Sequence, residues 1–293
     1  MAGGRTGSGP YAAAMADVAD EVHEHYENEH DEDGRLRRGP GQLELVRTRE
    51  IVRRHLPASP EGPAGPLRIL DVGGGTGIHA AWLADEGHQV HVVDPVLGHV
   101  ERVQGLASAE RAITAAAGDA RSLDEADASA DAVLLLGPLY HLPERADRVR
   151  ALAEARRVVR PGGPIFVAAI SRFASLLDGL SRGFLLDPAF HRIVTDDLRD
   201  GHHRNPDHVP HWFTTAYFHR PDELPGEADA AGLELVELVG IEGMAGWLGP
   251  LFERWDEPEV REAILYSARV VESEPALLGA SAHLLMVVRR PDS

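Results

Sequence analysis

The feature that most constrains the fold is a short apolar stretch that runs straight into a cluster of glycines. Residues 67–72 read Leu-Arg-Ile-Leu-Asp-Val, and four of the next five residues are glycine. The branched side chains favour a β-strand, and the sequence from His79 onward favours a helix. Glycine permits the backbone angles of a tight turn and lets a ligand approach the backbone closely. A strand, a glycine loop and a helix are the opening of a doubly wound α/β domain.

The spacing of the glycines distinguishes between two kinds of nucleotide-like ligand. The dinucleotide pattern G-x-G-x-x-G, counted from Gly73, requires a third glycine at the position of Ile78. The pattern present is D-x-G-x-G-x-G, formed by Asp71, Gly73, Gly75 and Gly77. This pattern resembles the first motif of the class I S-adenosylmethionine-dependent methyltransferases. The resemblance implies S-adenosyl-L-methionine as the cofactor.

Two further acids follow predicted strands. The strand 89–93 ends at Asp94, which is placed to accept hydrogen bonds from both ribose hydroxyls, although a strand-end turn is the alternative explanation. The strand 112–117 is followed by Asp119, which resembles the family residue that bonds the adenine amino group; a turn aspartate is again the alternative. The predicted cofactor-binding residues are Asp71, Gly73, Gly75, Gly77, Asp94, Pro95, Asp119, Ala120 and Leu136.

Later segments complete the resemblance. Residues 132–136 are a fully apolar run that predicts a central strand, and R-V-V-R-P-G-G precedes the predicted strand 165–170. The family-like region covers about 67–170. A helix at 221–232, a strand at 233–241, a helix at 258–273 and a strand at 283–288 supply the remaining elements of the core. The resemblance implies an α/β, Rossmann-like doubly wound sheet of seven strands in the order 3-2-1-4-5-7-6.

The chain divides into a cap and a catalytic domain. Residues 1–56 are predicted to form an N-terminal tail and helical cap, and residues 67–293 the methyltransferase domain, with an insertion at 171–218 after strand five. The acidic segment 11–32 favours a helix. Such a helix either presents a solvated face or covers the cofactor as a lid, with Tyr26 facing inward.

Composition excludes several chemistries. The net charge of −18 argues against a nucleic-acid partner, and the chain contains no cysteine and no lysine. A disulfide framework, a thiolate metal site and a Schiff-base lysine are therefore absent. No apolar run reaches membrane-spanning length, and the first residues lack the apolar core of a secretory signal. We expect a cytoplasmic protein without a membrane partner.

Candidate catalytic and acceptor-binding residues lie beyond the central strand and in the insertion. His141 is the best candidate base, although a turn or packing role is equally compatible with its position. Tyr26, Tyr140, Arg172, Arg204 and Tyr217 are predicted to contact the acceptor. The insertion carries four histidines within 202–211, but their spacing is not that of a zinc-binding helix, so no metal site is predicted.

These observations predict methyl transfer from S-adenosylmethionine to a small-molecule acceptor enclosed by the N-terminal helices and the insertion. Methyl transfer from a sulfonium depends mainly on in-line positioning of the acceptor, so a catalytic triad is not required. A peptide or protein methyltransferase is the alternative within the family. An NAD-type dehydrogenase and a non-catalytic cofactor-binding module are alternatives of other classes. The acceptor atom and the oligomeric state stay open at this point.

Overall fold

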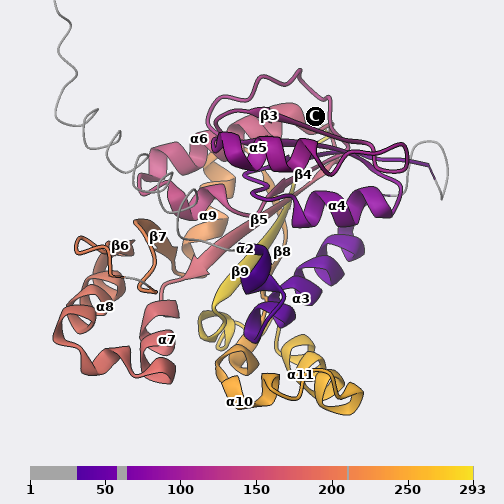
Figure 1. Ribbon diagram of the computed structural model, residues 1–293. Helices are drawn as coiled ribbons and strands as arrows, with labels where there is room; N and C mark the ends of the chain where they lie inside the picture. The colour runs from indigo at the N-terminus through magenta and orange to yellow at the C-terminus, as the bar shows by residue number, and fades with distance from the viewer. Residues whose placement is uncertain (1–31, 58–64, 210, 293) are drawn as a thin grey trace, which may run out of the picture.

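The computed structural model describes residues 32–57, 65–209 and 211–292. The predicted acidic helix and Tyr26 lie outside the described residues. The chain alternates strands and helices through its first half, as the pattern of apolar runs predicts (Figure 1). The core strands are β1 (Arg68–Val72), β2 (Gln89–Asp94), β3 (Ile113–Ala117), β4 (Ala132–Leu135), β5 (Pro164–Ser171), β8 (Glu234–Gly240) and β9 (His283–Arg289).

The order of these core strands confirms the predicted topology. Strands β3, β2, β1, β4 and β5 lie side by side and are all parallel. The final strand β9 then runs antiparallel against β5, and β8 pairs antiparallel with the far side of β9. Since β8 and β9 are the sixth and seventh core strands, the sheet has the order 3-2-1-4-5-7-6. This arrangement brings the start of β9 to the carboxyl end of β5, where His283 faces Ile170 in the register.

Helices cover both faces of the sheet, because successive strand residues point to opposite sides. On one face, Val133 and Leu135 pack in a cluster with side chains of α6 and α9. On the other face, Ala132 and Leu134 pack with α3 and α4. The helices around the core are α3 (Pro40–His55), α4 (Ile78–Asp85), α5 (Leu97–Gln104), α6 (Arg145–Val158), α9 (Glu223–Ala230) and α11 (Pro258–Val270).

The insertion after β5 forms a separate lobe that projects from the carboxyl end of that strand (Figure 1). It contains α7 (Ala174–Arg182), α8 (Pro188–Asp200), β6 (His202–His203) and β7 (Ala216–His219). Strand β7 pairs in parallel with the last two residues of β5, beyond the point where β4 has ended. The lobe has its own small core around Phe190, Val194 and Trp212. Aromatic residues of the insertion therefore stabilise the lobe itself.

The first half of α3 packs against helices from the C-terminal part of the chain. The short α2 (Glu32–Leu36) precedes α3, and α10 (Gly249–Phe252) lies near α11 at the same end of the molecule (Figure 1). Leu43 of α3 is fully buried against a cluster from α10 and α11. Among the described residues, no helix combines the length and the apolar character that a membrane span requires.

Candidate active site

A cavity of about 280 Å³ lies at the carboxyl ends of the parallel strands. Ligands of doubly wound folds bind at this edge. The loops after β1, β2, β3 and β4 supply one part of its wall. Further lining residues come from α2, α3, α4, β5, β9 and the loop after β8. Eight of the nine predicted cofactor residues line it: Asp71, Gly73, Gly75, Asp94, Pro95, Asp119, Ala120 and Leu136.

Three glycines of the loop, Gly73, Gly75 and Gly77, have positive φ. Gly73 has φ +68°, and a Cβ atom there would lie 2.7 Å from the Pro138 ring. Gly75 has φ +55°, and its missing Cβ would meet no described atom within 4 Å. The first glycine thus allows close packing, and the second leaves space open at the cavity. Gly77 does not line the cavity; it precedes α4 and packs toward Val103.

Asp94 closes β2 and holds the glycine loop. Its Oδ2 accepts a hydrogen bond from the Gly75 backbone N–H at 2.9 Å. Its Oδ1 accepts from the Val96 N–H at 2.9 Å and lies 3.1 Å from His99 Nδ1. The side chain is buried yet belongs to the cavity wall. Because a carboxylate offers about four lone-pair sites, capacity is left for a ligand hydroxyl.

Asp71, at the end of β1, is the most deeply buried acid of the site. Its Oδ2 has no hydrogen-bond partner among the described residues. Burial first, and the charge of Asp94 second, raise the pKa of Asp71 to about 7. A buried carboxyl without a partner is costly, so this position favours a cationic ligand group.

Asp119 is half-exposed and tied to a neighbouring arginine. Arg121 donates to it from Nη2 at 2.6 Å and from its backbone N–H at 2.8 Å. Burial raises the pKa of Asp119, but these hydrogen bonds outweigh it and lower the pKa below its ordinary value. Asp119 is therefore a charged acceptor at the β3 end of the cavity.

The loop after β4 gives the cavity an aromatic wall. Pro138–His141 form a short 3₁₀ helix that turns Tyr140 and His141 toward the cavity. Their rings meet edge to face with centroids 4.7 Å apart. The His141 ring also stacks on Phe213, at 6.0 Å, which ties the wall to the insertion. Both side chains line the cavity, and their roles as base and acceptor contact stay predictions.

Four histidines line the cavity, and one of them, His283, is not singled out by the sequence pattern. His283 is the first residue of β9, and its Nδ1 lies 2.5 Å from Glu242 Oε1. Glu44 of α3 lies 3.7 Å from the same nitrogen. Within the described residues, these three side chains are the cluster whose ligand atoms are close enough together to hold a metal ion. Their separation in sequence hides this contact, because the antiparallel β8–β9 pair brings Glu242 to His283, and the packing of α3 brings Glu44 to both.

The predicted acceptor residues of the insertion lie elsewhere. Arg172 is buried, donates to the Phe218 carbonyl at 2.7 Å and pairs with Glu223 at 2.9 Å. Its Nη2 also lies 3.1 Å from the Tyr217 hydroxyl, so both residues belong to a buried network of the lobe. Arg204 is exposed. None of the three lines the cavity, and the physical reason is that the insertion folds around its own polar and aromatic core.

Two of the insertion histidines, His202 and His203, make contacts within the lobe. His203 is buried between Asp197, at 2.9 Å, and the Trp212 carbonyl, at 2.6 Å. His202 packs edge to face on Tyr217. These contacts occupy the imidazoles within the lobe.

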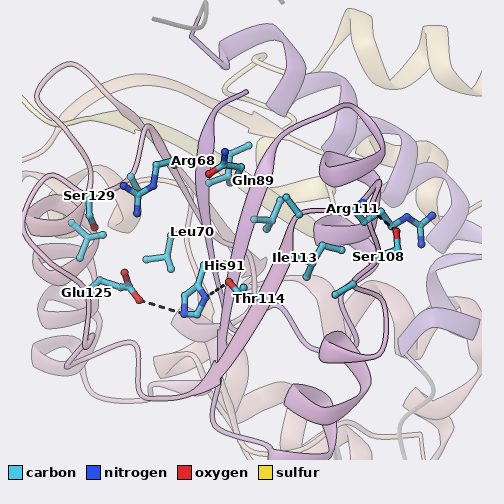
Figure 2. Close-up of a pocket in the computed structure, with 16 residues that line it drawn as sticks. Arg68, Leu70, Gln89, His91, Ser108, Arg111, Ile113, Thr114, Glu125 and Ser129 are labelled. Atoms are coloured by element: carbon cyan, nitrogen blue, oxygen red, sulfur yellow. Dashed lines mark hydrogen bonds and ion pairs between the residues drawn. The ribbon is translucent and has the colours of Figure 1, made fainter. Parts of the chain in front are cut away.

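A larger cavity, of about 380 Å³, lies at the opposite edge of the sheet. Figure 2 shows its lining, where His91 lies between Thr114 and Glu125. Its walls come from the first residues of β1, β2 and β3. Because ligands of this architecture bind at the carboxyl ends of the strands, the smaller cavity is the candidate active site.

Comparison with known proteins agrees with this architecture. A methyltransferase-domain family model matches residues 69–163. A ubiquinone biosynthesis O-methyltransferase of Ralstonia nicotianae is 33% identical over 184 residues, which cover 61% of this chain and 68% of that protein. An S-adenosylmethionine-dependent methyltransferase of Methanosarcina mazei shares the fold with a TM-score of 0.54 at 15% identity, covering 83% of this chain and 98% of that one. The 1,6-didemethyltoxoflavin-N1-methyltransferase of Burkholderia thailandensis shares the fold with a TM-score of 0.55 at 14% identity, covering 99% of this chain and 94% of that one.

The fold, the glycine loop and the similarity to a relative over two thirds of its length define the class. The chain belongs to the class I S-adenosylmethionine-dependent methyltransferases. It is an enzyme of methyl transfer, and S-adenosylmethionine is its cofactor. The dehydrogenase alternative is thereby set aside.

Proposed function

We propose that the protein transfers a methyl group from S-adenosylmethionine to a hydroxyl group of a small aromatic molecule. One observation carries the proposal: a single cavity has carboxylates at the ends of β1, β2 and β3 and an aromatic wall after β4. The part of the cavity lined by carboxylates suits a charged nucleoside, and the part lined by the aromatic wall suits a flat apolar acceptor. Methyl transfer requires that the methyl donor and the acceptor bind in the same cavity.

The carboxylates fit the cofactor by their chemistry. Bound S-adenosylmethionine supplies an electrophilic methyl group on a positively charged sulfur. Asp71 offers a buried oxygen without a partner to a cationic group, and Asp94 offers its remaining lone pairs to ribose hydroxyls. Asp119 offers a charged acceptor to an amino group. We therefore assign cofactor binding to Asp71, Gly73, Gly75, Asp94, Pro95, Asp119, Ala120 and Leu136, with Gly77 shaping the loop.

The acceptor half favours a small, flat molecule. Leu136, Ala168 and Ile241 add apolar surface beside Tyr140 and His141. The described N-terminal helices contribute Leu36, Glu44 and Thr48 to the wall, which supports a closed pocket over the open groove that a peptide requires. We infer that residues 1–56 act as a cap on the methyltransferase domain 67–293. The name of the Ralstonia relative, an O-methyltransferase, supports oxygen as the acceptor atom.

A screen with isotopically labelled S-adenosylmethionine tests this function. The acceptors are catechol, hydroxybenzoates, flavonoids and hydroxyquinones, with matched aromatic amines and peptides in parallel, and products are identified by mass spectrometry. We expect label on the oxygen of at least one hydroxylated aromatic compound. Label that appears only on amines or peptides would contradict the proposal.

A further inference from the structure

We propose that His283, held by Glu242, is the catalytic base that takes the proton of the acceptor hydroxyl during methyl transfer. The inference deepens the proposed function and rests on it. It assigns a role to a buried histidine–glutamate pair that the sequence pattern does not single out.

Glu242 is fixed in place before it meets the histidine. Its side chain is almost fully buried, at 2% exposure. Its Oε2 accepts hydrogen bonds from Ser281 Oγ at 2.7 Å and from the His283 backbone N–H at 3.0 Å. The other oxygen, Oε1, lies 2.5 Å from His283 Nδ1. A carboxylate anchored in this way orients the imidazole and stabilises its protonated form.

The second ring nitrogen is left for the acceptor. Nδ1 is occupied by Glu242, and among the described residues Nε2 makes no hydrogen bond. His283 lines the cavity, on the side where Ile241 and Ala168 form the apolar wall. A hydroxylated ring lying against that wall places its oxygen within reach of an imidazole nitrogen. The arrangement of carboxylate, imidazole and reactant hydroxyl is that of an activated nucleophile.

The charges around His283 match it to a phenolic proton. Burial lowers the pKa of His283, but the Glu44 and Glu242 carboxylates outweigh burial and raise the pKa to about 9. Arg35 opposes them in part, because its guanidinium makes two hydrogen bonds to Glu44, at 2.5 and 2.9 Å. A phenol such as the tyrosine side chain has a pKa of about 10. Proton transfer from a phenol to this imidazole is therefore nearly balanced in free energy.

The chemical step conserves atoms and charge. The acceptor O–H bond breaks and its proton goes to His283 Nε2. The electron pair on oxygen forms the new O–C bond, while the C–S bond breaks and its pair stays on sulfur. The imidazolium that results is paired with the Glu242 carboxylate. No further reactant is needed.

Glu44, Glu242 and His283 also satisfy the spacing of a metal site, so a bound metal ion is the alternative that has to be tested. The ion pairs favour a proton on His283 over a bound metal ion, because Arg35 neutralises Glu44 and the His283 imidazolium neutralises Glu242. A divalent ion would have to displace Arg35 and deprotonate His283. Methyl transfer that disappears on treatment with EDTA and returns with added Mg²⁺ or Zn²⁺ would overturn the assignment.

The first experiment uses 4-nitrocatechol, whose anion and neutral form differ in visible absorbance. Wild type, His283→Gln and the control His202→Gln, which alters an insertion histidine outside the cavity, are each saturated with S-adenosylhomocysteine. We expect the bound probe to ionise at a pH at least about one unit lower in wild type and control than in His283→Gln. Calorimetry with S-adenosylhomocysteine should give affinities within twofold for all three, which establishes that the variant is folded.

The second experiment measures methyl transfer with the acceptor screen. His283→Gln should lower the turnover number by roughly 100-fold or more, the usual contribution of a general base, with S-adenosylhomocysteine affinity intact. In wild type the rate should rise with pH to a midpoint near 9, and Glu242→Gln should move that midpoint down. His141→Gln provides the comparison with the base predicted from sequence.

The outcomes separate the two proposals. A turnover number of His283→Gln within twofold of the wild-type value overturns the role of His283. The same conclusion follows if the roughly 100-fold loss of turnover occurs in His141→Gln and not in His283→Gln. A parallel loss of S-adenosylhomocysteine binding would make His283 a cofactor residue. If the wild-type protein methylates no hydroxylated aromatic compound and does not change the spectrum of 4-nitrocatechol, the proposed function is wrong. The role of His283 as a base is then wrong as well.

Discussion

Asp71 combines deep burial with a neighbouring negative charge. Burial and then Asp94 raise its pKa to about 7, whereas the unfolded chain releases this proton near 4. The folded protein therefore binds the proton more tightly than the unfolded chain does. As a result, the contribution of this group to the free energy of unfolding falls as pH rises from about 4 to about 7, and is constant above that range.

Cofactor binding should release a proton from Asp71. At pH 7 this carboxyl is about half protonated, and a cation beside it favours the charged form. We expect S-adenosylmethionine binding at pH 7 to release roughly half a proton from this group, measured by calorimetry in buffers of different ionisation enthalpy. Asp71→Asn should abolish this proton release, because the amide side chain does not titrate. A binding enthalpy that shows the same buffer dependence in both proteins would contradict the assignment.

Single residues differ in how far the sequence reveals them. Asp71, Asp94 and the glycines are predictable because each directly follows a strand, so the topology alone brings them to one edge. His283 and Glu44 are not predictable in this way, since they come together only where α3 packs against β9, two elements at opposite ends of the described chain. Arg172 does not line the cavity, and a sequence pattern does not reveal that the insertion uses this side chain as an internal tie.

At the level of elements, the core strands and helices follow from periodicity, and the elements of the insertion do not. The apolar runs at β1, β4 and β5 identify buried strands within about one residue. In contrast, β7 is four residues long and is defined by its pairing with the end of β5. The short α2 is defined by tertiary contacts too. Asp33 of α2 accepts from Thr76 Oγ1 in the glycine loop and pairs with Arg102 of α5 at 2.7 Å.

Breaking the tie between α2 and the glycine loop should loosen the cover of the cavity. Asp33→Ala removes the contacts with Thr76 and Arg102 and should cost about 1 kcal/mol, equivalent to roughly fivefold faster release of S-adenosylhomocysteine. Stopped-flow displacement measures that rate. The matched control is Asp85→Ala, which removes another Asp–Arg pair, with Arg111, at the amino edge of the sheet. Equal rates in the two variants would show that α2 does not cover the site.

Across the whole molecule, binding groups gather at one edge of the sheet while both faces are sealed by helices. Two large apolar clusters hold the sheet between its helical layers, and neither includes the acids of the site. The carboxyl edge is therefore where ionisable groups accumulate without interrupting the core. The cavity there receives side chains from α2 and α3 at the start of the described chain and from β9 at its end.

The account depends on Asp94 and its neighbours holding the nucleoside part of the cofactor. Calorimetry with S-adenosylhomocysteine tests this directly, with wild type, Asp94→Ala and NAD as the control ligand. We predict that wild type binds S-adenosylhomocysteine and not NAD, and that Asp94→Ala, which loses a charged hydrogen-bond acceptor, binds about 1–3 kcal/mol more weakly. A folded wild type that binds neither S-adenosylhomocysteine nor S-adenosylmethionine, or an Asp94→Ala variant with unchanged affinity, would contradict the account.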